Sequence, residues 1–428
     1  METAAGARTG KSRGARTRNA GTPGDAGPDG AARTDEAERT LPRAAPPWID
    51  RRFRLVLVVS ALALACCLGT LVSLYSFWGD FEVYRWAVHT WLAGGDFINT
   101  RSPVRNPDPL PWVYPPFALL PLAPFAVVPS TVGLSMLNAV DVLALGATLY
   151  LVTRHAWPSA GTRGALSVAA AGLPLTFLLE PVHACFGQGQ VNIALMGLVA
   201  LDCLARAPRW PRGLLVGIAA AIKLTPAAFL LFFLLRKDYR AALTAVITAA
   251  GCTAIGFAVD FTASVDYWFR HGPAADVAGH VLNSNQSVSG ALSRLDLPPL
   301  AQHAGWALLC LGLLVLTARI LPRVSAPTAF VTVGLFAVLV SPTSWSNHWV
   351  WAAPGLLLLC GAAIRHRCGY LPVVATALVA ITAPWHFPPS VGGAELTWTP
   401  VQHLVGNTYV LTAVVALVWI ALATRTRR

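Results

Sequence analysis

Long apolar runs alternate with short polar or basic stretches along most of this chain. About thirteen such runs can be delimited, at roughly residues 54–76, 114–128, 131–153, 165–183, 190–206, 212–224, 226–236, 240–260, 302–320, 325–341, 348–364, 370–384 and 402–424. A helix that crosses a bilayer needs about 20 apolar residues, so several of these runs are short for a full crossing. The pattern predicts an all-α, polytopic transmembrane protein in which short re-entrant or interfacial helices accompany the spans.

Composition supports a membrane protein. The 428 residues are 55% hydrophobic and only 12% charged, whereas soluble domains carry about 25% charged residues. A soluble protein also needs a polar surface, so lipid must cover part of this chain. The net charge of +12 comes from arginines in a tail and in short loops, which is the positive-inside pattern of membrane proteins. It does not indicate a nucleic-acid partner.

The first 50 residues differ from the rest of the chain. They are rich in Ala, Gly, Arg, Thr and Pro and carry no apolar period, which predicts a disordered tail. The tail is too long and polar to be the first region of a cleaved signal peptide. Arg51, Arg52 and Arg54 flank the first apolar run and should hold the tail in the cytoplasm. The expected organisation is a cytoplasmic tail, 1–50, and a transmembrane domain, 51–428.

Basic clusters between the apolar runs predict which loops face the cytoplasm. The clusters are Arg154 with Arg163; Arg206, Arg209 and Arg212; Arg236, Lys237 and Arg240; Arg319 with Arg323; Arg365 with Arg367; and Arg425, Arg427 and Arg428. They agree with one another if 114–128 does not cross and 212–236 forms a short hairpin that reaches the outer side near Lys223. About 12 crossings then result. The alternative, in which 114–128 crosses and 212–236 is one span, places Arg154 and Arg163 outside.

This topology brings the polar stretches together on the outer, periplasmic face of a cell membrane. They are the predicted outer loops 77–113 and 261–301, together with 183–190, 342–348 and 385–401. Nucleotide sugars and ATP are scarce there, and the chain carries no phosphate-binding P-loop or dinucleotide fingerprint. Chemistry on that face would need a donor that arrives through the membrane.

Asp80 opens a stretch whose apolar residues, from Phe81 to Leu92, have helical spacing. Such a helix would lie in the membrane interface. Asp80 could simply cap this helix, or it could act as a general base that deprotonates a sugar hydroxyl.

Three polar residues interrupt apolar surroundings further along the chain. Gln190 and Asn192 lie between two apolar helices, where amides suit sugar hydroxyls or hydrogen bonds between helices. Lys223 stands alone in an apolar stretch. A lipid phosphate is its natural partner, and the alternative is that the side chain extends to a lipid headgroup.

The polar stretch before residue 350 contains Trp345 and His348. A histidine between tryptophans is often only an interface residue, but here it could also bind sugar or phosphate.

The motifs together resemble a known family. They are Asp80-Phe81 with Tyr84, Tyr114-Pro115-Pro116, Glu180-Pro181, Gly189-Gln190-Val191-Asn192, Lys223-Leu224-Thr225-Pro226, Asn285-Gln286-Ser287 and Ser341-Pro342-x-Ser344-Trp345-x-x-His348-Trp349. In order and spacing this set resembles glycosyltransferase family 87, from about residue 54 to the C-terminus. The resemblance implies a GT-C fold and a polyprenol-phosphate-mannose-dependent α-(1→2) mannosyltransferase that acts on phosphatidylinositol mannosides or lipomannan.

The resemblance also implies residue roles. Asp80 would be the general base and His348 a functional histidine, although the family often has two adjacent histidines where this chain has Asn347-His348. A β-linked donor would react with inversion, and Lys223 and His348 would meet the departing lipid phosphate. The residues expected to bind sugar or acceptor are Tyr84, Tyr114, Glu180, Gln190, Asn192, Gln286 and Trp345. No DxD motif or His/Asp cluster suggests a metal, so neither a metal nor another cofactor is expected.

Three other functions are alternatives: transfer of a different sugar, transport, and a scaffold role. A lipid-linked arabinofuranosyl donor would suit the same architecture. A transporter would show paired broken helices in corresponding halves, but no internal repeat is evident. A scaffold would not need polar motifs that converge on one face.

Overall fold

A computed structural model describes residues 53–74, 79–103, 109–271, 281–366 and 369–425. These residues belong to one compact unit, Ala44–Arg428. The predicted disordered tail, 1–50, lies outside the described residues, as do Arg51, Arg52, Arg367, Arg427 and Arg428.

The described residues form helices joined by turns, with two isolated β-bridges. The order is α3 (Phe53–Leu74), α4 (Gly79–Leu92), η1 (Pro116–Ala118), α5 (Leu119–Ala126), α6 (Ser130–Ala156), η2 (Pro158–Ala160), α7 (Gly161–Thr176), α8 (Glu180–Gln188), α9 (Asn192–Leu204), α10 (Leu214–Ile222), η3 (Thr225–Phe229), α11 (Leu230–Leu235), α12 (Tyr239–Val259), α13 (Phe261–Val265), η4 (Asp266–His271), α14 (Val288–Ser293), α15 (Pro299–Ile320), η5 (Leu321–Arg323), α16 (Ala326–Val340), η6 (Ser346–His348), α17 (Ala352–His366), α18 (Leu371–Thr382), η7 (Pro384–His386), η8 (Ala394–Thr397), α19 (Pro400–Gly406) and α20 (Thr408–Arg425). The predicted all-α class is confirmed.

Four described helices are long and apolar enough to cross a membrane: α3, α6, α12 and α15. Two bent pairs, α7 with α8 at 76° and α19 with α20 at 72°, raise the number to six if each pair is one span. Several shorter apolar helices of 10–17 residues accompany them. The chain is therefore a helical protein with several candidate spans. Helix length alone gives four to six spans among the described residues, whereas the charge pattern predicts about 12 crossings.

The segment 114–128 folds back on itself, which agrees with the predicted segment that does not cross. Tyr114 lies beside Tyr84 of α4, with 2.8 Å between the two hydroxyls. At the other end of the segment, Arg85 of α4 donates a 2.7 Å hydrogen bond to the carbonyl of Ala126. Since both ends contact the same short helix, the segment returns to the side from which it started.

The predicted hairpin in 212–236 is also present. Lys223 has an extended backbone between α10 and η3, and Pro226 follows it inside η3. Gly213, before α10, lies against Ala241 near the start of α12. The end of α11 meets the same place, because the amide of Asp238 donates to the carbonyl of Phe233. The chain therefore reverses near Lys223.

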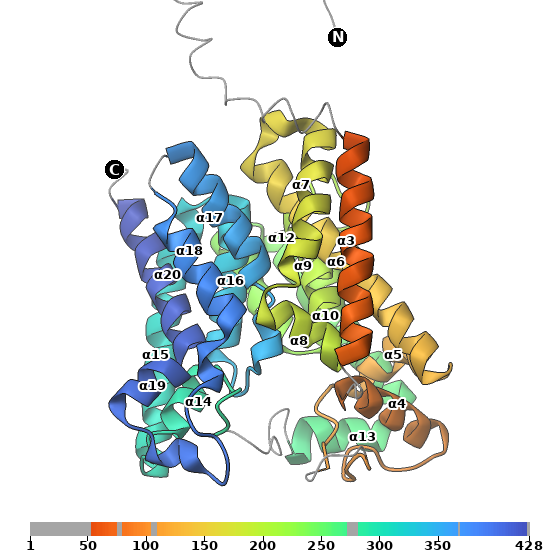
Figure 1. Ribbon diagram of the computed structural model, residues 1–428. Coiled ribbons are helices and arrows are strands. Elements are labelled where there is room, and N and C mark those ends of the chain that lie inside the picture. The colour runs from red at the N-terminus through yellow and green to blue at the C-terminus, as the bar shows by residue number, and fades with distance from the viewer. Residues whose placement is uncertain (1–52, 75–78, 104–108, 272–280, 367–368, 426–428) are drawn as a thin grey trace, which may run out of the picture. The chain divides into compact units, whose positions relative to one another are not determined.

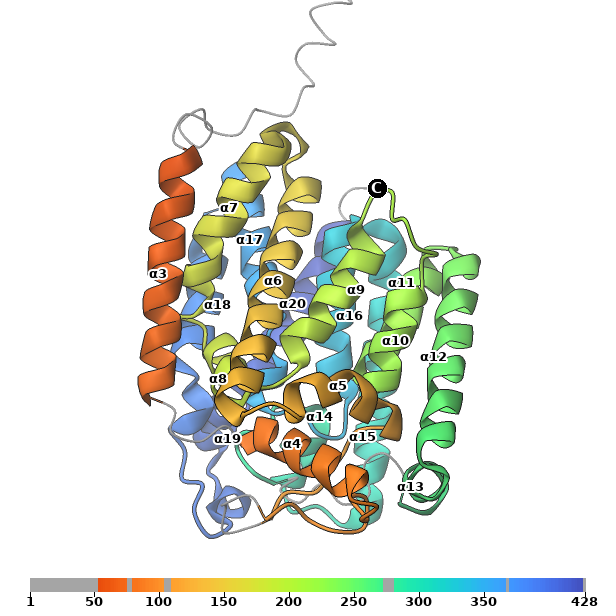
Figure 2. The same cartoon turned by 90° about the vertical axis from the view of Figure 1, so that its right-hand side faces the viewer.

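The predicted cytoplasmic loops meet at one end of the bundle. Arg206 donates a 3.1 Å hydrogen bond to the carbonyl of Arg154, and Arg365 donates to the carbonyl of Ala156 at the end of α6. Helices α4, α13, α14 and α19 gather at the opposite end (Figures 1 and 2). Basic loops and the candidate chemistry are therefore separated by the length of the helices.

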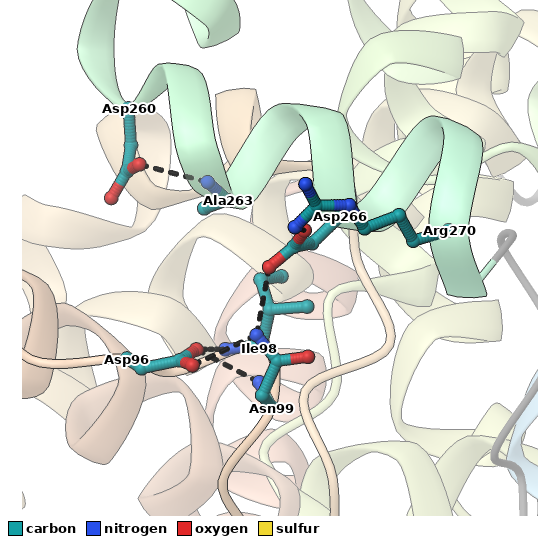
Figure 3. A network of polar contacts seen from close by, with 7 residues as sticks. All are labelled: Asp96, Ile98, Asn99, Asp260, Ala263, Asp266 and Arg270. Carbon is teal, nitrogen blue, oxygen red and sulfur yellow. Dashed lines mark hydrogen bonds and ion pairs between the residues drawn. The ribbon is translucent and has the colours of Figure 1, made fainter.

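A polar network joins the predicted outer loops (Figure 3). The carboxylate of Asp96 accepts hydrogen bonds from the amides of Ile98 and Asn99, at 3.0 and 2.8 Å. The Asn99 side chain donates to Asp266 at 2.8 Å, and Asp266 pairs with Arg270 at 2.6 Å. The loop after α4 is thereby fixed to the α13–η4 segment.

Candidate active site

Helix α4 carries Asp80 in its first turn and buries Phe81, Tyr84 and Val88. Asp80 is the second residue of the helix, so it lies just inside the helix and not at the expected cap position. Gly189 allows this helix to approach the turn between α8 and α9. Its φ is +65°, and a Cβ there would lie 2.6 Å from the Cβ of Phe81. A residue without a side chain is therefore needed at this contact.

Gln190 links Asp80 to a pair of buried tyrosines. Its Oε1 lies 3.0 Å from the hydroxyl of Tyr84 and 3.2 Å from that of Tyr114, and both hydroxyls can donate to it. The same side chain makes a hydrogen bond with Asp80. Since the amide oxygen accepts from the tyrosines, the amide nitrogen donates the hydrogen bond to the Asp80 carboxylate.

Opposing effects set the proton affinity of Asp80. Burial raises the pKa of Asp80 above that of an ordinary carboxyl, while the hydrogen bond from Gln190 and the positive charge of Lys223 lower it. Burial is the largest effect. The result is a carboxylate more basic than an exposed aspartate, which suits a general base.

Lys223 forms the cationic part of the same cluster. Its Nζ donates to Oδ1 of Asn192 at 2.8 Å and lies 3.2 Å from Nε2 of His348. An ammonium group has no lone pair, so His348 must accept through Nε2 and is assigned as neutral with its proton on Nδ1. The ammonium also lies 5.3 Å from the ring centroid of Tyr114, a favourable cation–π distance.

An apolar cavity opens beside Lys223. This first cavity comprises about 410 Å³ of space, part of it open to solvent, and its polar wall consists of Asn192, Lys223, Thr225 and His348. The remaining wall is apolar and includes Phe229 and Trp351. A positive charge at one end of an apolar cavity suits a phosphate attached to a hydrocarbon chain.

Glu180 belongs to a neighbouring cluster. Its Oε1 accepts from Ser346 at 2.7 Å, and its Oε2 accepts from Tyr409 at 2.8 Å. These bonds join α8 and α20 to η6, the short helix that carries His348. Glu180 therefore fixes the position of η6 and, with it, of His348. Sequence reasoning missed Ser346 and Tyr409, because nothing in their local pattern distinguishes them from other polar residues at a helix end.

Among the described residues, no hydrogen bond links Gln286 or Trp345 to the cluster around Asp80. The Gln286 amide donates to the carbonyls of Asn283 and Gly406, both at 2.7 Å, and the side chain is fully buried. Trp345 is half-buried and forms a β-bridge with Asn285. These contacts hold the long outer loop, and contact of the two residues with sugar stays a prediction.

Metal ligands are not grouped in the described residues: no set of three or more His, Cys, Asp or Glu side chains there could hold a metal ion. The polar groups near Asp80 are instead amides, tyrosine hydroxyls and one ammonium, which bind hydroxyl and phosphate oxygens.

Comparisons with known proteins identify a family and several similar mycobacterial proteins. The model of a family described as glycosyltransferase family 87 matches residues 112–342. A Mycolicibacterium smegmatis protein named polyprenol-phosphate-mannose-dependent alpha-(1-2)-phosphatidylinositol mannoside mannosyltransferase is 36% identical over 375 residues, which cover 81% of this chain and 84% of that protein. A Mycobacterium tuberculosis protein of the same name is 35% identical, over 76% of this chain and 77% of its own length. A second M. tuberculosis protein, whose name specifies phosphatidylinositol pentamannoside, is 28% identical over 93% of both chains.

Proposed function

Because this chain belongs to glycosyltransferase family 87, we propose that it transfers mannose from polyprenol phosphate mannose to a cell-envelope glycolipid. The acceptor is a phosphatidylinositol mannoside or a lipomannan, and the new linkage is α-(1→2). The names of the similar mycobacterial proteins support this donor, acceptor class and linkage. The fold is of the GT-C type.

One observation carries the proposal: Asp80 and Lys223 belong to a single cluster, in which Gln190 contacts both Asp80 and Tyr114, and the Lys223 ammonium lies 5.3 Å from the Tyr114 ring centroid. Transfer from a lipid phosphate needs a base for the attacking hydroxyl and a positive charge for the departing phosphate. The cluster supplies both, with Gln190 and Tyr114 between them.

The reaction is a single displacement. Asp80 takes the proton of the acceptor hydroxyl while the hydroxyl oxygen attacks the anomeric carbon of the β-linked mannose. The bond from that carbon to the phosphate oxygen breaks, and polyprenol phosphate leaves with the electron pair. Attack from the opposite face inverts the anomeric carbon and gives an α-linkage. Lys223, held by Asn192 and His348, stabilises the negative charge on the departing phosphate.

The other site residues have supporting roles. Tyr84, Tyr114, Gln190 and Asn192 provide hydrogen bonds to sugar hydroxyls. Glu180, Gln286 and Trp345 position the segments around them and act on the substrates only indirectly. The reaction uses no metal and no other cofactor, since an ammonium group already faces the phosphate. Treatment with EDTA should leave turnover unchanged.

The protein is multi-pass, with about 12 crossings, and its site faces the periplasm. The contact of Arg206 with Arg154 supports this orientation, because it groups basic loops at the end away from Asp80. The hydrogen bond from Arg365 to the carbonyl of Ala156 argues against the alternative topology, which would place residues 154–163 outside and leave Arg365 inside. The partners are two lipid-linked substrates and the membrane itself.

The direct test of the activity uses purified protein with three labelled donors: polyprenol phosphate mannose, polyprenol phosphate arabinofuranose and GDP-mannose. Transfer to phosphatidylinositol mannoside should occur with the first donor alone. Transfer from the arabinofuranose donor alone would assign the other sugar. Movement of lipid-linked sugar across vesicles without a transferred product would identify a transporter.

A further inference from the structure

A second apolar cavity lies next to the first, and Trp351 lines both. The second cavity comprises about 1010 Å³ of space, part of it open to solvent, and is formed mainly by α16, α17, α18 and α20. Trp351 stacks on Phe229 with 5.4 Å between ring centroids. Gly334 of α16 lies so close to Trp351 that a Cβ there would fall 2.2 Å from the indole ring. Trp351 is therefore a firmly packed partition between two apolar spaces.

The two cavities differ in charge. The first includes Lys223 and His348 in its wall, whereas no lysine, arginine or histidine is among the residues that line the second. The polar end of the second cavity contains Tyr409, whose hydroxyl donates to the carboxylate of Glu180. A phosphate suits the first cavity and is disfavoured in the second, whose lining has no cation and whose Tyr409 is bonded to a carboxylate.

The length of the second cavity matches one lipid leaflet. Its lining residues on α20 run from Tyr409 to Ile420, a rise of about 17 Å at 1.5 Å per residue. Half of a bilayer's hydrocarbon core measures about 15 Å. The cavity therefore begins near Glu180 and is about as long as one leaflet is deep, so an acyl chain of a lipid in that leaflet would fit along it.

Hydrogen bonds join the polar end of the second cavity to the candidate active site. Glu180 accepts from Ser346, which belongs to the same short helix as His348. Trp349, only 4% exposed, lines the cavity and has a buried indole nitrogen without a hydrogen-bond partner among the described residues. An indole N–H is a donor, and an ester or hydroxyl oxygen at the boundary between a lipid's head and chain would satisfy it.

We propose that the second cavity holds one acyl chain of the glycolipid acceptor, while the prenyl chain of the donor enters the first cavity. The inference rests on the proposed function, since it assigns to each lipid substrate a place on its own side of Trp351. The two chains then approach the cluster of Asp80 and Lys223 from different directions, and the acceptor headgroup reaches Asp80 past η6.

Alkyl α-mannosides with methyl, octyl and dodecyl chains test the assignment as acceptors. In the wild-type protein, KM for the acceptor should fall as the chain lengthens, because more methylene groups are buried. Ala416 lines the second cavity, so Ala416→Trp should reduce the methyl-to-dodecyl ratio of KM by at least about tenfold. Val415 is the neighbouring residue, is 67% exposed and does not line the cavity. Val415→Trp is the matched control and should keep the wild-type ratio.

A labelling experiment on the wild-type protein does not depend on how the variants fold. A dodecyl mannoside with a diazirine at the chain end should label α17 or α20 on irradiation, and a polyprenol phosphate with the same group should label α9 or η3. Labelling of α20 by the prenyl probe, or an increase in donor KM alone in Ala416→Trp, would overturn the assignment. Absence of mannosyl transfer with every acceptor, while the labelling pattern is as expected, would instead contradict the proposed function.

Discussion

At the scale of single residues, Gln190 connects the candidate base, Asp80, with the two tyrosines that are expected to bind sugar. Its amide oxygen faces Tyr84 and Tyr114, and its amide also hydrogen-bonds to Asp80. The sequence indicated that Gln190 could bind sugar, because an amide beside apolar helices needs partners. It could not indicate that Asp80 is one of these partners, since contacts between residues distant in sequence depend on the packing of α4 against the α8–α9 turn.

The first prediction concerns pH. Asp80 acts as a base only when ionised, so kcat/KM should fall as the pH drops through its raised pKa. The hydrogen bond from Gln190 lowers this pKa, so its removal in Gln190→Met should raise the pKa further and move the acidic limb to higher pH. Tyr84→Phe keeps the amide and should move the limb less. An acidic limb that is the same in Gln190→Met and wild type would show that another group is titrating.

The second prediction concerns Lys223. Hydrogen bonds to charged groups contribute about 1.5–3 kcal/mol, so Lys223→Ala should lower kcat/KM for the lipid donor by roughly 10- to 150-fold. Lys223→Arg should retain part of the activity, because the charge remains while the geometry changes. Arg209→Ala, at an exposed site in a basic loop, is the control. Wild-type kinetics in Lys223→Ala would mean that another cation meets the phosphate.

At the scale of elements, the apolar runs predicted where most helices lie but not where they bend. The run 165–183 is divided into α7 and α8, and the run 402–424 into α19 and α20. Apolar spacing remains helical through such a bend, so it gives no signal. The fold-back of 114–128 and the hairpin near Lys223 were predictable, because the preferred reading of the charges on either side required both.

The third prediction concerns the turn between α8 and α9. Gly189→Ala should destabilise the protein by about 1–2 kcal/mol through its left-handed backbone, and its Cβ would press on Phe81. Because Phe81 follows Asp80 directly, α4 must shift, and a shift of about 1 Å can cost some 10²-fold in rate. Gly146→Ala, in α6 with open space around it, is the control for turnover and thermal stability in detergent. Equal turnover in both variants would show that α4 need not be placed so closely.

At the scale of the whole molecule, the chain separates basic loops from the candidate chemistry. Arg206 and Arg365 hold the basic end together, while the network of Asp96, Asn99 and Asp266 holds the other (Figure 3). The charge pattern predicted this separation. The charge pattern also predicted about 12 crossings, a number that helix length does not test, because several described apolar helices have only 10–17 residues.

The fourth prediction tests orientation. In a background without cysteines, Thr100→Cys places a thiol at an exposed position in the loop after α4, and Arg209→Cys places one in a basic loop. An impermeant thiol reagent should label Thr100→Cys in intact cells and Arg209→Cys only after lysis. The reverse pattern would place the site in the cytoplasm and exclude a periplasmic mannosyltransferase.

The central claim is that the bundle positions Asp80 as the base for mannosyl transfer, and Asp80→Asn tests it most directly. Asparagine keeps the shape and suits the start of a helix as well as aspartate does, but it cannot accept the proton. The measurement is turnover of polyprenol phosphate mannose by the purified variant, with thermal stability in detergent as the control. Turnover should fall by about 10²–10⁴-fold while the melting temperature stays within a few degrees. Transfer near the wild-type rate would contradict the account and move the search for the base to Glu82 or Glu180.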